Sequence, residues 1–169
     1  MIGNDVVDLK LAKIESNWQR KGFLSKIFTK NEQILIQNSE NQEIAVWNLW
    51  SRKEAAYKIW NRETGIRKYN PLKFECFDLV SEIGKMQFES KTYFTKTEIT
   101  TDYIYTIAVS NFDDFSFIIQ LDNSIKIEKT NNIPCYILKN RDVKKISKTH
   151  HGNFTFLVSL GNSQSRFQF

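Results

Sequence analysis

The sequence predicts an α+β fold in which an N-terminal strand and helices pack on a mainly antiparallel sheet. The stretch 44–60 contains good helix formers and lacks Gly and Pro. From residue 73 onward, short runs rich in Phe, Ile, Val, Thr and Tyr alternate with turn residues. Helices therefore come early and strands late. With no internal repeat or shift in composition, we expect one domain over residues 1–169.

The composition is that of a folded globular protein with a moderate basic excess. The chain has 169 residues, of which 41% are hydrophobic and 14% aromatic, and its formal net charge is +5. This charge favours an acidic partner or a phosphate-bearing ligand without requiring nucleic acid. Cys76 and Cys135 lie far apart and lack the spacing of a zinc site or a disulfide framework. With no signal-peptide pattern and no bilayer-spanning stretch, we expect a soluble cytoplasmic protein without a membrane partner.

The first residues predict a strand that contains an unexplained acid. Residues 1–9 are rich in Val, and Gly3 allows another backbone or a ligand to approach closely. Asp8 is well placed to cap a helix over 9–15. Asp5 lies next to Val6 and Val7 in the same strand and has no comparable structural explanation, so it is a candidate functional residue.

The next segment is basic and leads to a further helix. Residues 9–27 carry more basic than acidic side chains. The basic ones are Lys10, Lys13, Arg20, Lys21 and Lys26. They form either a solvated basic face or a docking surface for an acidic protein. The segment Thr29-Lys30-Asn31-Glu32 is a capping box that opens a helix over 30–38, which gives Glu32 a structural explanation.

The helix expected over 44–60 is apolar nearly all round, as buried helices are. At about 100° per residue, Trp47, Trp50, Glu54 and Lys58 fall on one face. A carboxylate among Trp side chains is costly unless a cation or a donor meets it. Either Glu54 pairs internally with Lys58, or Glu54 holds a metal ion and Lys58 an anion. The spacing alone does not distinguish these interpretations.

The region after residue 73 predicts an antiparallel sheet. Once the long helix has ended at Gly65, strand-like runs occupy residues 73–79, 86–94, 97–109, 115–121, 124–129, 134–138 and 154–160. The two histidines, His150 and His151, precede the last run. An adjacent pair in a turn is more often structural or solvated than catalytic. The sequence contains no catalytic-triad order, nucleophile elbow or P-loop.

Three short motifs follow one another along the chain: G-N-D near the start, then F-T-K-N-E, then W-S-R-K-E-A-A-Y-K in the long helix. Together they resemble the 4′-phosphopantetheinyl transferase superfamily, whose pattern is roughly G-x-D, F-[ST]-x-x-E and W-x-x-K-E-A-x-x-K. This resemblance covers about residues 1–66. A looser one covers Ser147–Gly152, S-K-T-H-H-G, which is similar to the family's S-x-S-H-x-G with Thr149 in place of the usual Ser.

The resemblance implies an enzyme, a holo-[acyl-carrier-protein] synthase. Such an enzyme transfers the phosphopantetheine arm of coenzyme A to a serine of a carrier protein and releases adenosine 3′,5′-bisphosphate. The resemblance also implies that Asp5 and Glu54 bind Mg²⁺ and that Glu54 and Lys58 act in catalysis. For coenzyme A, Lys58 matches the lysine that contacts the phosphates, and Lys53 accompanies it in the same charge cluster. His150 matches the histidine near those phosphates.

One departure from the family pattern concerns the metal ligands. Longer members carry D-x-E at the first site, but here Val7 occupies the position of the second acid, as in the shorter members. The metal would then have two protein carboxylates, with phosphate oxygens and waters as further ligands, which suits Mg²⁺. The carrier serine is the nucleophile, and either Glu54 or a water of the metal ion would take its proton.

The resemblance also implies partners. The acyl or peptidyl carrier protein, of fatty-acid, polyketide or peptide synthesis, presents an acidic surface in this chemistry. The basic run Lys10–Lys26 is therefore a candidate docking surface. Short members commonly assemble as trimers with sites between subunits. This chain holds one such unit, so we expect a homo-oligomer.

Two alternatives remain at this stage. One is a non-catalytic relative that binds coenzyme A or a carrier protein, against which the presence of both Asp5 and Glu54 argues. The other is a basic β domain that binds single-stranded nucleic acid, for which Lys and aromatic residues interleave over 93–105. Such a domain does not need a buried Glu in a Trp-rich helix. We therefore favour the enzyme and expect no nucleic-acid partner.

Overall fold

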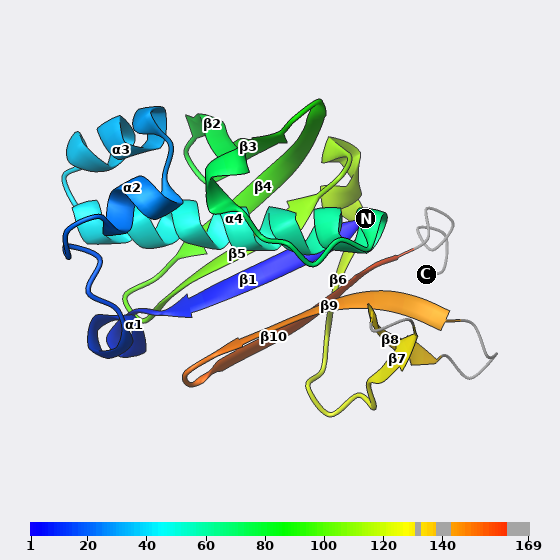
Figure 1. Ribbon diagram of the computed structural model, residues 1–169. Helices are drawn as coiled ribbons and strands as arrows, with labels where there is room; N and C mark the ends of the chain where they lie inside the picture. The colour runs from blue at the N-terminus through cyan, green and yellow to red at the C-terminus, as the bar shows by residue number, and fades with distance from the viewer. Residues whose placement is uncertain (131–132, 138–142, 162–169) are drawn as a thin grey trace.

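Two antiparallel sheets lie beside one long helix in the computed structural model, which describes residues 1–130, 133–137 and 143–161 (Figure 1). The first sheet contains Ile2–Asp8 (β1), Phe74–Val80 (β2), Ile83–Phe88 (β3), Lys91–Ile99 (β4) and Tyr103–Val109 (β5), in the order β1-β5-β4-β3-β2. The second contains Ile118–Leu121 (β6), Glu128–Thr130 (β7), Ile133–Ile137 (β8), Val143–His151 (β9) and Phe154–Leu160 (β10), in the order β6-β10-β9-β8-β7. The predicted α+β class is confirmed, although the strands form two sheets.

The helices come mostly before the second strand. They are Leu9–Glu15 (α1), Phe23–Ile27 (α2), Lys30–Gln37 (α3) and Gln42–Thr64 (α4), with short 3₁₀ segments at Pro71–Lys73 (η1) and Phe112–Phe117 (η2). The predicted capping box of α3 is confirmed, since the Thr29 hydroxyl and the Glu32 carboxylate each accept the other residue's backbone N–H. Helix α4 ends at Gly65, whose left-handed φ of 73° favours glycine. Within the described residues, no helix combines the length and apolar composition that a membrane span needs.

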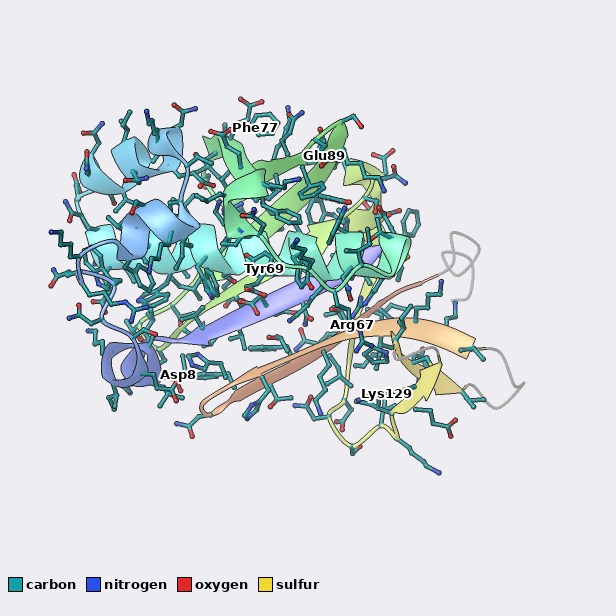
Figure 2. All side chains as sticks on the ribbon, in the orientation of Figure 1. Asp8, Arg67, Tyr69, Phe77, Glu89 and Lys129 are labelled. Atoms are coloured by element: carbon teal, nitrogen blue, oxygen red, sulfur yellow. The ribbon has the colours of Figure 1, made fainter. Side chains whose placement is uncertain are left out.

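Helix α4 supplies the largest share of the main core by packing its side chains against the first sheet (Figure 1, Figure 2). Its buried apolar residues surround nearly its whole circumference: Val46, Trp47, Leu49, Ala55, Ala56, Ile59 and Trp60. A second, smaller core joins the first sheet to β10 and contains Tyr105, Val109 and Val158. Strand β1 lies between these two cores and contributes to both.

The side chains of β1 alternate between two sides, as the period of a strand requires. Ile2 and Val6 pack in the smaller core with β10. Gly3 and Asp5 face α4 instead. A Cβ atom at Gly3 would collide with the backbone carbonyl of Ala55, so glycine is what lets β1 lie this close to the helix. This close approach brings Asp5 to the surface of α4.

Several strand limits differ from the predicted ones. The run predicted over 97–109 is two strands, because the Thr100 hydroxyl accepts the N–H groups of Asp102 and Tyr103 and closes a tight turn. The run over 86–94 is likewise interrupted between β3 and β4. The histidines do not lie in a turn, since both belong to β9. The strand predicted over 134–138 corresponds to β8, and its last residue lies outside the described residues.

Candidate active site

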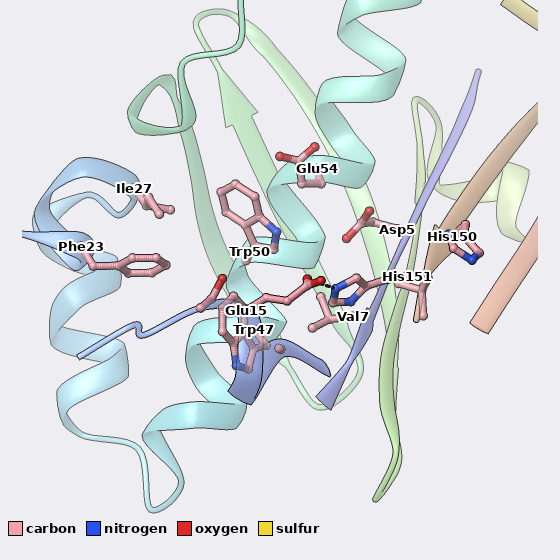
Figure 3. Close-up of a pocket in the computed structure, with 13 residues that line it drawn as sticks. Asp5, Val7, Glu15, Phe23, Ile27, Trp47, Trp50, Glu54, His150 and His151 are labelled. Atoms are coloured by element: carbon pink, nitrogen blue, oxygen red, sulfur yellow. Dashed lines mark hydrogen bonds and ion pairs between the residues drawn. The ribbon is translucent and has the colours of Figure 1, made fainter. Parts of the chain in front are cut away.

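Asp5 from β1 and Glu54 from α4 line the same pocket, which has a volume of about 370 Å³ (Figure 3). One part of its wall is polar and includes Glu15, His150 and His151, and another part is apolar and includes Phe23, Ile27, Trp47 and Trp50. The alternation of β1 and the helical face of Trp47, Trp50 and Glu54 together produce this arrangement. The structure therefore brings together the two acids that the sequence analysis singled out.

Asp5 is held by donors at one of its two carboxylate oxygens. The Lys58 ammonium lies 3.4 Å from Oδ1, and the Thr149 hydroxyl donates to the same oxygen over 3.3 Å. Burial raises the pKa of Asp5, and Lys58, Thr149 and Ser51 act against this rise. The net direction is upward, so the surroundings of Asp5 do not fully stabilise its negative charge.

Glu54 is perturbed more clearly. Burial, followed by the negative charge of Asp5, raises the pKa of Glu54 from its ordinary 4.5 to about 7, while Lys58 and the nearby hydroxyl of Tyr69 act in the opposite direction. The Tyr69 hydroxyl is buried, yet within the described residues no group meets it with full hydrogen-bond geometry. Glu54 thus lies in the apolar part of the pocket wall beside a second carboxylate, and no described residue forms an ion pair with it.

Lys58 turns toward β1 and not toward Glu54. Its ammonium donates to the backbone carbonyl of Asn4 over 2.6 Å and approaches Asp5. The interpretation of an internal Glu54–Lys58 pair is therefore wrong. The side chain of Lys58 is 25% exposed and does not itself line the pocket, although its ammonium contacts Asp5, which does.

Lys53 does not belong to the pocket, and the prediction that it contacts coenzyme A phosphates is wrong. Its side chain is fully buried and forms an ion pair of 2.6 Å with Glu32. Its ammonium also donates to the backbone carbonyls of Pro71, over 2.8 Å, and Phe74. One residue along a helix is a turn of about 100°, which carries Lys53 away from the face of Glu54.

The two histidines differ in surroundings. His151 accepts the Asp8 N–H at Nδ1 over 2.8 Å, so its proton resides on Nε2, which faces the Glu15 carboxylate at 3.3 Å (Figure 3). His150 lies on the opposite side of β9 and is exposed at the pocket's edge. The role implied for His150 stays a prediction.

The sequence analysis did not assign several residues of this region to the site, among them Glu15, Thr149 and His151. The signal that points to the last two is the alternation of polar residues along β9, where Ser147, Thr149 and His151 share a side. Asp8 is not directed into the pocket. As predicted, it caps α1 by accepting the N–H groups of Lys10 and Leu11.

The donor set of the pocket fits a divalent cation. Asp5 and Glu54 both have raised pKa values and face one cavity, so a dication would remove the repulsion that their ionised forms experience. Carboxylate oxygens suit a hard ion such as Mg²⁺. Within the described residues, no group of three or more His, Cys, Asp or Glu side chains forms a metal site. An ion here would therefore need further oxygen ligands from water or substrate.

Comparison with solved structures gives the class of fold. The structure is similar to "Chronobacterium ammoiniagenes apo-ACPS" (TM-score 0.52, 15% identity, 64% of this chain and 93% of that chain). It is also similar to the Helicobacter pylori holo-[acyl-carrier-protein] synthase in complex with coenzyme A (TM-score 0.53, 15% identity, covering 66% of this chain and 100% of that chain). The Thermotoga maritima holo-[acyl-carrier-protein] synthase matches over more of this chain (TM-score 0.52, 11% identity, covering 95% of this chain and 83% of that chain). The fold is thus that of holo-[acyl-carrier-protein] synthases.

The sequence comparison names the family. The model of the 4′-phosphopantetheinyl transferase superfamily matches residues 1–108, which include β1, α4 and both pocket acids. The chain belongs to this superfamily. A comparison with curated proteins finds no match.

Proposed function

We propose that this protein transfers the 4′-phosphopantetheine group from coenzyme A to a serine of an acyl or peptidyl carrier protein in a Mg²⁺-dependent reaction. The observation that carries the proposal is the meeting of Asp5 and Glu54 in one pocket, in a chain of this superfamily. We further propose that the whole chain acts as one cytoplasmic unit. The second sheet supports this, because β9 contributes to the same pocket.

Asp5 and Glu54 would hold the Mg²⁺ ion. When bound, the ion would neutralise the diphosphate of coenzyme A and increase the electrophilicity of its β-phosphorus. The hydroxyl oxygen of the carrier serine forms the new bond to this phosphorus, and the bond to adenosine 3′,5′-bisphosphate breaks. Lys58 is suited to offset negative charge on the leaving bisphosphate because its ammonium lies beside Asp5 and its side chain is partly exposed. Either Glu54 or a water of the pocket takes the serine proton.

The other side chains of the pocket would orient the substrates and limit water. The apolar wall of Phe23, Ile27, Trp47 and Trp50 borders the two acids and excludes water on that side. His150, exposed at the edge, is placed to contact a phosphate that extends out of the pocket. Lys53 has no part in the reaction.

The basic segment is suited to dock an acidic carrier protein. Helix α1 lines the pocket and also presents Lys13 and the 82% exposed Ile14 to solvent. Arg20 stacks on Phe23, which belongs to the pocket wall. A carrier bound over these residues would deliver its serine next to Asp5 and Glu54.

Self-association stays a prediction. The pocket described above is lined by α1, α2, α4, β1 and β9 of a single chain. Light scattering of the purified protein, with and without coenzyme A, measures the oligomeric state directly.

Mass spectrometry of an apo carrier protein tests the proposed function. The carrier is incubated with this protein, coenzyme A and Mg²⁺, and we expect a mass gain equal to the phosphopantetheine arm. The gain should vanish with a chelator and with Asp5→Asn or Glu54→Gln. Glu63→Gln, on α4 but outside the pocket, should keep it. Failure to modify fatty-acid, polyketide and peptide carrier proteins alike, or full activity in both pocket variants, would overturn the proposal.

A further inference from the structure

No strand of the described part of the chain pairs with the outer edge of β1, where side chains accept the backbone N–H groups instead. On its other edge, β1 pairs with β5. Along the outer edge, the N–H groups of Asn4, Val6 and Asp8 donate to side chains of β9, namely Ser147 Oγ at 3.0 Å, Thr149 Oγ1 at 3.1 Å and His151 Nδ1 at 2.8 Å. Alternate residues of β9 thus satisfy alternate donors of β1 without forming a ladder between the sheets.

The hydroxyl of Thr149 makes a second contact that determines its orientation. A hydroxyl has one hydrogen to donate and can accept at its lone pairs. Because Thr149 Oγ1 accepts the Val6 N–H, its own hydrogen is free for Asp5 Oδ1 at 3.3 Å. Thr149 is only 5% exposed, so water has little access to compete for this hydrogen. Lys58 approaches the same oxygen from α4 at 3.4 Å.

Both donors therefore gather on one oxygen of Asp5, and the carboxylate can turn its other oxygen, Oδ2, to the pocket. We propose that Thr149 is a positioning residue that fixes the Asp5 carboxylate in the orientation in which it binds Mg²⁺. This inference rests on the proposed function. It assigns the second sheet a task in the reaction, since β9 lies outside the segment that matches the family.

Ser147 provides a matched control. Its hydroxyl accepts the Asn4 N–H in the same way that Thr149 accepts the Val6 N–H, and it is equally buried in β9. Its second contact is with the guanidinium of Arg62, at 3.3 Å, and not with a carboxylate. Loss of the Ser147 hydroxyl therefore weakens the edge of β1 without releasing Asp5.

The test compares Thr149→Val, Thr149→Ser and Ser147→Ala with the unchanged protein. Binding of Mg²⁺ alone is measured by calorimetry and by the fluorescence of Trp47 and Trp50, and transfer is measured over a range of Mg²⁺ concentrations. Because groups that orient a metal ligand typically change affinity by about 10–100-fold, we expect Thr149→Val to weaken Mg²⁺ binding about tenfold or more. The Mg²⁺ concentration for half-maximal transfer should rise in parallel, with kcat at saturating Mg²⁺ nearly unchanged.

The controls separate positioning from folding. Thr149→Ser keeps the hydroxyl and should restore Mg²⁺ affinity, whereas Ser147→Ala should lower the unfolding temperature without changing that affinity. Unchanged Mg²⁺ affinity in Thr149→Val, or an equal loss in Ser147→Ala, would overturn the inference and leave the transferase proposal intact. An unchanged protein that neither binds Mg²⁺ nor modifies a carrier would overturn both.

Discussion

Replacing Glu54 with glutamine removes a poorly compensated charge from the pocket while keeping the shape of the side chain. Burial and the charge of Asp5 raise the pKa of Glu54 from 4.5 to about 7. Because the folded-state pKa lies above the unfolded one, ionisation of Glu54 opposes folding. This destabilisation begins as the pH rises above 4.5 and is complete above about 7. Without metal, the Glu54→Gln variant should therefore be more stable than the unchanged protein at pH 8.

The size of the effect follows from the two pKa values. The difference between 4.5 and about 7 corresponds to roughly 3 kcal/mol, at about 1.4 kcal/mol per pH unit. Glu54 is only partly buried, and water screens part of its charge. We therefore expect Glu54→Gln to increase the free energy of unfolding by about 2 kcal/mol at pH 8. For a chain of this size, that is an increase in Tm of about 4–8 °C. At pH 5, where the native Glu54 is protonated, the gain should fall below about 1 kcal/mol.

Thermal and urea unfolding at pH 5 and pH 8, in a chelator and again in Mg²⁺, measures this dependence. Mg²⁺ should stabilise the unchanged protein and leave Glu54→Gln nearly unaffected, and the variant should have lost transfer activity. Glu63→Gln is a control for which the expected change in stability at pH 8 has the opposite sign. Burial alone would raise the pKa of Glu63, but the hydrogen bond and charge of Lys91, together with hydrogen bonds from Tyr93 and Ser110, outweigh it and lower that pKa. Its removal should destabilise the protein at pH 8.

The result that refutes this reasoning is a metal-free Glu54→Gln variant that is less stable than the unchanged protein at pH 8. Glu54 would then be stabilised as an anion by the protein itself, and its charge would be structural. Loss of transfer with that loss of stability would carry no information about catalysis.

Three further outcomes are expected. Reversing Lys13 and Arg20 to Glu should raise the KM for the carrier protein severalfold while leaving that for coenzyme A nearly unchanged; an equal loss for both substrates in steady-state kinetics would exclude a docking role. Lys53→Met should lower the free energy of unfolding in urea by about 3–5 kcal/mol, because the buried Glu32 carboxylate then has no cation beside it. The double variant with Glu32→Gln should recover much of that loss. Asp8→Ala should lower the free energy of unfolding by about 1 kcal/mol at pH 7 because α1 loses its cap. Hydrogen bonds from backbone N–H groups lower the pKa of Asp8, so its stabilising contribution is present above pH 3.8 and is lost on acidification below that value. Chemical unfolding at several pH values measures this dependence.

Local rules predicted helices α1, α3 and α4, the start of α3 and the end of α4. The capping box at Thr29 and the glycine at Gly65 are short-range signals, and both were correct. Asp5 and Glu54 were found because each is a carboxylate near apolar residues and each matches an acid of the family motifs. Lys53 was assigned wrongly because its partner Glu32 lies on another helix, and nothing in the local spacing reveals that contact.

The contribution of β9 could not be predicted for a similar reason. The sequence Ser147–Gly152 suggested a turn, since two adjacent histidines before a glycine carry little strand signal. The structure extends β9 through His151 and aligns its alternate side chains with the N–H groups of β1. That alignment depends on how the two sheets pack, which is a property of the whole chain.

The charges of α4 show why Glu54 stands out chemically. Arg52, Lys53 and Glu54 are consecutive and point in three directions. Arg52 donates to Thr95 Oγ1 and to the backbone carbonyl of Glu82, and Lys53 has its ion pair and two carbonyls, so both buried cations are met by acceptors of the protein. Glu54 has no ion pair within the described residues and lies beside a second acid. In a helix that compensates its other buried charges, a carboxylate without an ion pair, next to a second carboxylate, is a reason to expect a cation from outside the chain.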